Sequence, residues 1–209
     1  MAITFTPSIV TTPIGVQPNY PQTHDVAHEG MLVAIQAHDV RSMLNQSLNV
    51  LPFGAMAMTD NTSGYDVDAV KLSTGATLNV GVVLDSPTFE GVSSGNAAYL
   101  GAPGAFPGTN IAADGRVGYP AKKTVNILRK GVIWVYSTEA IALGDAVRFW
   151  DTDYSATVTG AFLGRFCKTA SATRTTLVNS GMAWLSETTG PGLVQLEVNF
   201  PSVTFTADV

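Results

Sequence analysis

Histidine side chains near the start of the chain have a spacing that could serve a metal ion. His24 and His28 stand four residues apart, so on a helix they would share one face, as in helical zinc sites. Further ligands lie close by in the sequence: Asp25, Glu29 and His38. The stretch between Pro21 and Gly30 is, however, too short for a stable helix, and it lacks a His-Glu-x-x-His pattern. We therefore expect no metal or other cofactor, and we interpret these residues as polar groups at the entry to a domain.

A Gly-x-Ser-x-Gly string at residues 91–95 has the letters of the nucleophile elbow of serine hydrolases, with Ser93 as the nucleophile. That elbow needs a strand before it, a helix after it, and a histidine later in the chain. Here a loop rich in Gly, Ala and Pro follows Ser93, and all three histidines precede it. We therefore predict that the protein is not an enzyme, and we keep a hydrolase that uses Ser93 as a third hypothesis.

Two Asp-x-Asp pairs could bind calcium or catalyse glycoside hydrolysis. They are Asp66 with Asp68, and Asp151 with Asp153. The second pair follows Trp150 at the expected end of a strand, and we interpret both pairs as solvated turns.

Aromatic side chains could form a platform that stacks on sugars. The candidates are Trp134, Tyr136, Phe149, Trp150, Phe162 and Trp184. They are spread over expected strands with alternating neighbours, which favours packing in a core or a subunit interface. Carbohydrate binding is therefore the second hypothesis.

Charged residues make up only 13% of the chain, whereas soluble proteins average about 25%. A neutral exterior suits a protein that contacts copies of itself or a neighbour, because few charges lose water on assembly. Residues 1–115 contain two basic residues, Arg41 and Lys71, against nine acidic residues. No basic surface can form there, so we expect no nucleic-acid partner.

The lengths of the apolar runs and the number of cysteines limit the class of protein and its environment further. No run approaches the roughly 18 apolar residues of a membrane span, so we expect no membrane partner. Cys167 is the single cysteine, which excludes a disulfide framework and fits assembly in a reducing cytosol. We expect Cys167 to be a small buried side chain.

The clearest structural signal is residues 125–150, which predict two strands and two turns. We predict one turn at residues 129–131, Arg-Lys-Gly, and another at residues 143–145, Leu-Gly-Asp. Apolar and polar residues alternate over residues 193–200, the period-two pattern of a half-buried strand. Further strands are expected within residues 30–35, 52–58 and 78–84, and a turn at residues 61–64.

One segment favours a helix. Residues 39–48 place Val40, Met43, Leu44 and Leu48 at helical spacing behind Asp39 as a cap. Strand and turn signals dominate elsewhere. We therefore predict an all-β fold, either an antiparallel β-barrel or a jelly-roll-like sandwich, with an extended N-terminal arm.

We divide the chain into an N-terminal arm, residues 1–25, and a single β domain, residues 26–209, with a Gly/Ala/Pro-rich loop insertion at residues 86–119. Four prolines favour an extended arm over a folded unit. The arm and the loop also carry apolar residues that need a surface to pack on, with a disordered arm as the alternative. These residues are Ile3, Phe5, Ile9, Val10, Tyr99 and Phe106.

The order of the strand motifs resembles that of the small structural proteins that decorate or cement the heads of tailed bacteriophages. The motifs are a Gly-Met strand at residues 29–33, Pro-Phe-Gly at 52–54, Gly-Val-Val at 81–84, an Ile-Leu-Arg-Lys-Gly element at 125–135, Gly-Asp-x-Val at 144–147, a Trp strand at 183–185 and a final strand at 194–200. The resemblance covers residues 26–200. The long arm and residues 86–119 depart from the shorter members.

The resemblance implies a non-enzymatic virion protein that binds the outer surface of the major capsid lattice and stabilises the head. Such a protein would be made in the host cytoplasm and act as a homo-oligomer, with a homotrimer favoured over a dimer. The arm and loop residues above, together with Arg129 and Lys130, would make capsid or subunit contacts, the two cations against an acidic neighbour. The alternative is a carbohydrate-binding or host-adhesion module of a virion.

Overall fold

The computed structural model describes residues 27–33, 37–60, 68–85, 111–112, 114–200 and 202–208. The strands are β1 Asp39–Asn45, β2 Leu51–Pro52, β3 Met56–Thr59, β4 Ala69–Leu72, β5 Asn79–Val83, β6 Gly118–Tyr119, β7 Thr124–Ser137, β8 Val147–Trp150, β9 Phe166–Cys167, β10 Thr175–Ser180, β11 Met182–Trp184, β12 Gly192–Asn199 and β13 Thr204–Ala207. Within the described ranges, no helix is long and apolar enough to cross a membrane. The predicted all-β fold is confirmed.

Five strands close into a barrel in the order β1, β4, β3, β5 and β7, with β7 pairing back to β1. Four of these pairings are antiparallel, whereas β1 and β4 run parallel, with Leu44 opposite Ala69. Of the two predicted architectures, the barrel is therefore the one that forms, and it is mixed rather than wholly antiparallel. Closure leaves none of the five strands as a free edge within the barrel.

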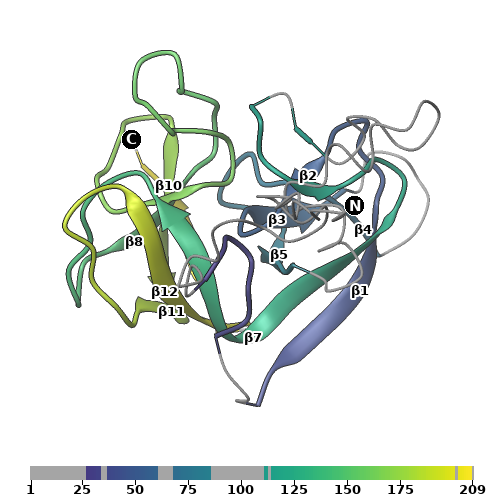
Figure 1. The fold of residues 1–209 in the computed structure, drawn as a ribbon, viewed down its shortest axis with the longest axis horizontal. Helices are drawn as coiled ribbons and strands as arrows, with labels where there is room; N and C mark the ends of the chain where they lie inside the picture. Colours follow the sequence, from purple (N-terminus) through teal and green to yellow (C-terminus); the bar gives the residue numbers. More distant parts are fainter. Residues whose placement is uncertain are drawn as a thin grey trace, which may run out of the picture.

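The long strand β7 leaves the barrel and continues into the remaining part of the same 11-stranded hydrogen-bonded sheet, which we call the second sheet. Its first half pairs with β1, and its second half, from Lys130 to Ser137, pairs with β12. The second sheet continues from β7 through β9, β8 and β10 to β13, while β11 pairs with β12. In Figure 1, β7 runs from the barrel strands on the right to the second sheet on the left.

The turn predicted at residues 129–131 is wrong, because β7 is continuous there. Asp39 lies opposite Lys130 but Val40 lies opposite Leu128, so Arg129 is an extra residue that bulges from the ladder. Gly131 follows with φ of 138°, a backbone angle that favours glycine. A bulge and a glycine bend a strand without ending it, and here they direct β7 from one sheet to the next.

Side chains of the barrel strands alternate between two hydrophobic cores, one inside the barrel and one under the second sheet. Val125 and Ile127 pack inside the barrel with Val83. Their neighbours Leu128 and Val82 point the other way, into the core of the second sheet. Successive residues of a strand face opposite sides, so β5 and β7 form a wall shared by both cores. Large buried side chains complete the second core: Phe149, Phe166, Trp184, Val194 and Leu196.

The helix predicted at residues 39–48 is also wrong, since residues 39–45 form β1. Met43 and Asn45 are buried while Ser42 is exposed, which is strand alternation, and Leu48 is 86% exposed. Pairing with both β4 and β7 satisfies the backbone of this segment and overrides its local pattern. Asn45 then ends the strand, because its side-chain amide donates to the carbonyls of Asn49 at 2.8 Å and Pro120 at 3.1 Å.

Several other local predictions are confirmed. Residues 78–84 contain β5, residues 193–200 contain most of β12, and a turn at Leu143 and Gly144 precedes β8. The strand expected at residues 52–58 is only partly confirmed, because Phe53 and Gly54 form a turn between the end of β2 at Pro52 and the start of β3 at Met56. Of the strand expected at residues 30–35, only a bridge from Leu32 to Ile133 forms among the described residues. The turn expected at residues 61–64 lies outside the described residues.

Gly81 of β5 packs directly against the backbone of β7, and replacing it tests the barrel. A Cβ atom at position 81 would lie 2.3 Å from the carbonyl oxygen of Leu128. We expect Gly81→Ala to lower the free energy of unfolding by more than about 2 kcal/mol, because the backbone must shift. Gly190→Ala is the control, since no atom lies within 4 Å of its added Cβ. Urea titration measures both, and equal stabilities would contradict the packing.

Candidate interaction surfaces

The first described segment, residues 27–33, is bound tightly to β7. The N–H of Gly30 donates to the carbonyl of Trp134 at 2.8 Å, and the N–H of Val33 donates to that of Val132 at 2.9 Å. In return the N–H of Trp134 donates to Met31 at 2.8 Å. This segment therefore fixes the point at which the chain preceding Ala27 joins the domain.

The same segment is tied to the end of β5. The His28 side chain hydrogen-bonds the buried carboxylate of Asp85, and the N–H of Asp85 donates to the carbonyl of Gly30 at 2.8 Å. The chain that precedes Ala27 and the chain that follows Asp85 are thus attached to the domain at one place. The structure gives His28 a carboxylate partner and places His38 at the surface, while His24 and Asp25 lie outside the described residues.

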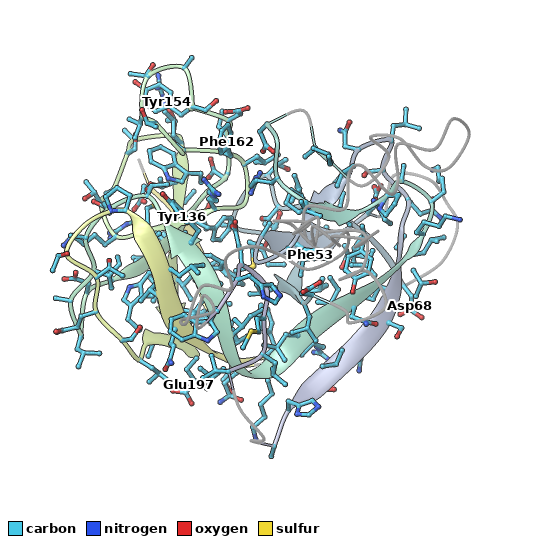
Figure 2. All side chains as sticks on the ribbon, in the orientation of Figure 1. Phe53, Asp68, Tyr136, Tyr154, Phe162 and Glu197 are labelled. Carbon is cyan, nitrogen blue, oxygen red and sulfur yellow. The ribbon has the colours of Figure 1, made fainter. Side chains whose placement is uncertain are left out.

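Glu29 forms an ion pair that connects this segment to the second sheet. The guanidinium of Arg165 lies 3.2 Å from its carboxylate and sits over the Tyr136 ring, 4.1 Å from the centroid. Phe162 contacts the same guanidinium at 5.3 Å, and Figure 2 shows Tyr136 and Phe162 close together. Because the ion pair is mostly buried, it holds residues 27–33 firmly on the domain.

A groove of about 480 Å³ lies between the barrel and the second sheet. Its lining combines apolar side chains with two cations and one acid: Met43, Leu78, Val80, Phe200, Val203 and Phe205, with Arg41, Arg129 and Asp68. Arg129 contacts Asp39 at 4.0 Å, and Lys130 is exposed on the surface. The groove can accept an apolar segment with a negative charge beside it.

Only two of the residues predicted to make contacts lie in described parts of the chain, namely Arg129 and Lys130. The others, Ile3, Phe5, Ile9, Val10, Tyr99 and Phe106, lie outside them. Sequence reasoning missed Arg41, Phe200 and Phe205 as partners of Arg129 in the groove. Their distance along the chain gives no local signal, and only the strand pairing around β7 brings them together.

A second groove, of about 730 Å³, lies at the far end of the barrel. It exposes Leu48 and also Ile111, which is 41% exposed. Arg116 lines it and is held by the Asp114 carboxylate at 2.7 Å and by the Leu163 carbonyl at 3.0 Å. Burial of Asp114 favours its neutral form, but hydrogen bonds and charge from Arg116 outweigh this, so the pKa of Asp114 lies below its ordinary value.

The candidates for chemistry are placed as follows. Ser93 and Asp66 lie outside the described residues. Asp151 accepts a hydrogen bond from Thr176 at 2.8 Å, while Asp153 is exposed just before a turn and accepts a hydrogen bond from the N–H of Ser155 at 3.0 Å. Asp153 is therefore solvated as predicted, whereas Asp151 is half-buried and makes a structural hydrogen bond instead of lying in a solvated turn.

Two of the three tryptophans are buried and serve the core. Trp150 donates its indole N–H to Thr138 at 3.3 Å, and Trp184 donates to the carbonyl of Ala146 at 3.3 Å. Neither can stack on a sugar. Phe149 is fully buried as well, so three of the six residues of the predicted aromatic platform are removed. Cys167 is buried as predicted, and burial raises the pKa of its thiol.

The described part of the chain is thus a barrel joined to a second sheet, with two grooves lined by apolar and charged side chains of the kind that contact other proteins. The family model described as "Structural cement protein (E217 gp24/Pam3 gp6)" matches residues 16–199, so the chain belongs to the phage structural cement protein family. It is accordingly a non-enzymatic structural component of a phage capsid.

A solved structure shares this fold. A chain from "The capsid of Myoviridae Phage XM1" superposes with a TM-score of 0.55 at 13% sequence identity. The match covers 90% of this chain and 99% of that chain. No curated protein matches the sequence.

The ion pair of Asp114 predicts a pH dependence of stability. The pKa of this carboxyl is lower in the folded than in the unfolded protein. The ionised carboxylate therefore stabilises the fold at pH values above its ordinary pKa of 3.8, and the stabilisation is lost as the pH falls through the folded pKa. We expect Asp114→Asn to be about 1–2 kcal/mol less stable than wild type at pH 7, with the difference shrinking below pH 4. Urea titrations across this range measure it. Asp153→Asn, exposed, is the control, and a constant difference would contradict the assignment.

Proposed function

We propose that the protein binds the outer surface of the major capsid lattice of a phage head and reinforces the shell. Membership of the structural cement family over residues 16–199 carries this proposal. The shared fold with a chain from a myovirus capsid supports it. A cement protein acts where the shell is under outward pressure, so the outer surface is the place where added contacts resist opening of the lattice.

The composition of the chain suits such a role. Only 13% of residues are charged, so its surface can be covered by a neighbour at a low desolvation cost. Each copy needs to contribute only modest contacts, because many copies on one lattice act together. The two grooves offer apolar side chains for such contacts, including Leu48 and Leu78, which are 86% and 54% exposed.

The arm and the loop provide the remaining contacts in this proposal. Their attachment points meet where His28 bonds Asp85, so both segments can reach the same neighbour. The apolar residues of the two segments, Ile3, Phe5, Ile9, Val10, Tyr99 and Phe106, would pack on the lattice or on a sister subunit. Closed cyclic symmetry is the common arrangement for such proteins, and we propose a homotrimer.

Arg129 and Lys130 would face an acidic partner. Residues 1–115 carry two basic and nine acidic residues, a net charge of 2 − 9 = −7, so the first part of a sister subunit offers such a surface. Lys130 is exposed, and Arg129 contacts only Asp39 among described carboxylates, at the outer limit of an ion pair. Complementary charge of this kind would steer association and fix its register.

Binding to heads tests the proposal directly. Purified protein is mixed with heads that lack it, and we expect it to sediment with them and to raise the temperature at which they release DNA. The physical reason is the sum of many small contacts between lattice subunits. A protein that never sediments with heads would contradict the proposed function.

A pair of arm variants belongs to the same experiment. Ile9→Asp with Val10→Asp places two charges where apolar contacts are proposed, and we expect binding to heads to fall by about tenfold or more. Thr11→Asp with Thr12→Asp adds the same charge at adjacent polar positions and is the control. Equal binding by the two variants would remove the arm from the contact.

Charge reversal tests the two cations. We expect Arg129→Glu with Lys130→Glu to lower the oligomer mass measured by light scattering, because like charges would meet in the interface. The domain should stay folded, since an exposed pair such as Arg129 with Asp39 contributes only about 0–1 kcal/mol. Lys122→Glu with Lys123→Glu changes the net charge equally at another surface. An unchanged mass, or an equal effect of the control, would contradict the contact.

A further inference from the structure

We propose that residues 2–6 of one copy add as a strand to the open edge of β13 in a neighbouring copy, with Phe5 entering the groove beside Phe205. The inference rests on the proposed role of the arm in subunit contacts and names its partner, a second copy of this chain. Three independent observations carry it: a repeated sequence, an open strand edge, and a groove on the correct face.

The repeated sequence links the two ends of the chain. Residues 3–6 read Ile-Thr-Phe-Thr, and residues 203–206 read Val-Thr-Phe-Thr. The tripeptide Thr-Phe-Thr occurs at these two places in the sequence and nowhere else. Both copies lie outside residues 16–199, the part that matches the cement family. A feature shared by the two ends and absent from the matched part points to a function that the ends perform together.

The structure shows how this sequence behaves as a strand in β13. Phe205 faces the core, with its ring centroid 6.0 Å from that of Phe149 and 6.1 Å from that of Phe200. On the opposite face, Thr206 accepts a hydrogen bond from Asn179 at 2.7 Å, and Thr204 bonds Ser180. The same alternation in residues 3–6 would place Phe5 on the face of Phe205 and the two threonines on the hydroxyl-rich face.

β13 has a free edge. It is the last strand of its sheet and pairs with β10, and no other described strand lies beside it. The N–H of Asp208 donates to the carbonyl of Thr175 in the segment of β10. Backbone groups two residues apart in a strand point to the same side, so those of Thr206 also point at β10. By alternation, the backbone N–H and C=O groups of Phe205 and Ala207 point away from β10. These groups are a template for one more strand.

The groove lies on the side where the added phenylalanine would project. Phe200, Val203 and Phe205 form one wall, and Met43 and Leu78 belong to the other. Its volume of about 480 Å³ lies within the range of about 300–1,000 Å³ in which proteins bury small ligands. A phenylalanine ring placed there would contact the rings of Phe200, which is buried, and Phe205, which is partly buried at the margin of the second core.

The arm has the length and the charge to reach a neighbour. The chain from Thr6 to Ala27 spans up to about 70 Å when extended, whereas a domain of this size has a radius of gyration of about 16 Å. Residues 1–23 contain no charged side chain, so packing on a strand edge removes no charge from water. A strand exchanged between copies links subunits, whereas one docked on its own domain links nothing.

Hydrogen exchange on the full-length protein tests the added strand. In wild type we expect slow exchange at the amides of Phe205 and Ala207, because the arm accepts their hydrogen bonds. Thr4→Pro removes a donor and breaks the pairing, so the two amides should exchange about tenfold faster or more. Thr11→Pro is the control, outside the proposed strand. Fast exchange in wild type, or equal protection in Thr4→Pro, would overturn the proposal.

A mixing experiment tests whether the strand is exchanged between copies. Protein with Thr4→Cys is mixed with protein carrying Thr206→Cys, so that a disulfide can form only between two chains, since Cys167 is buried. We expect cross-linked dimers with this pair and none when Thr173→Cys replaces Thr206→Cys. Protected edge amides without a cross-link would overturn the exchange. No capsid is present in either experiment, so a failure here is distinct from a failure to bind heads.

Discussion

The backbone hydrogen bonds of β7 hold the whole molecule together. Its fourteen residues pair with β1 and then with β12, and they also bind β5, the segment around Leu32, and β9. The barrel cannot close without β7, and among the described strands no other pairing connects the second sheet to it. The bulge at Arg129 and the backbone angle of Gly131 let a single strand serve both, because they turn its direction without interrupting its pairing.

This arrangement couples the two cores. Val82 and Leu128 lie on the outer face of the barrel and are buried only because the second sheet covers them, while Val83 and Ile127 fill the barrel itself. A load applied between the two parts would act along the covalent chain of β7 and in shear on its ladders. For a protein of a family that reinforces capsids, a strand that runs through both parts is a suitable element to bear it.

Local patterns predicted much of the fold and failed where distant partners decide. The alternation of residues 193–200 and the turn at residues 143–145 depend on near neighbours, and both were predicted correctly. The Arg-Lys-Gly sequence at residues 129–131 is compatible with either a turn or a bulge. The bulge forms because β7 pairs with β1 and β12 on either side of it. Residues 39–48 failed for the same reason. The groove around Arg129 was beyond prediction, because Arg41 and Phe205 reach it only through that pairing.

The family match divides the chain into a scaffold and its ends. Residues 16–199, the part that matches the family, contain the barrel, β7 and the wall shared by the two cores. The first fifteen residues and β13 lie outside the match. The scaffold meets the ends at defined places, since residues 27–33 are fixed on β7 and β13 is fixed on β10. The first fifteen residues and β13 can therefore change in sequence, and with them the contacts they make, without disturbing the backbone hydrogen bonds of β7.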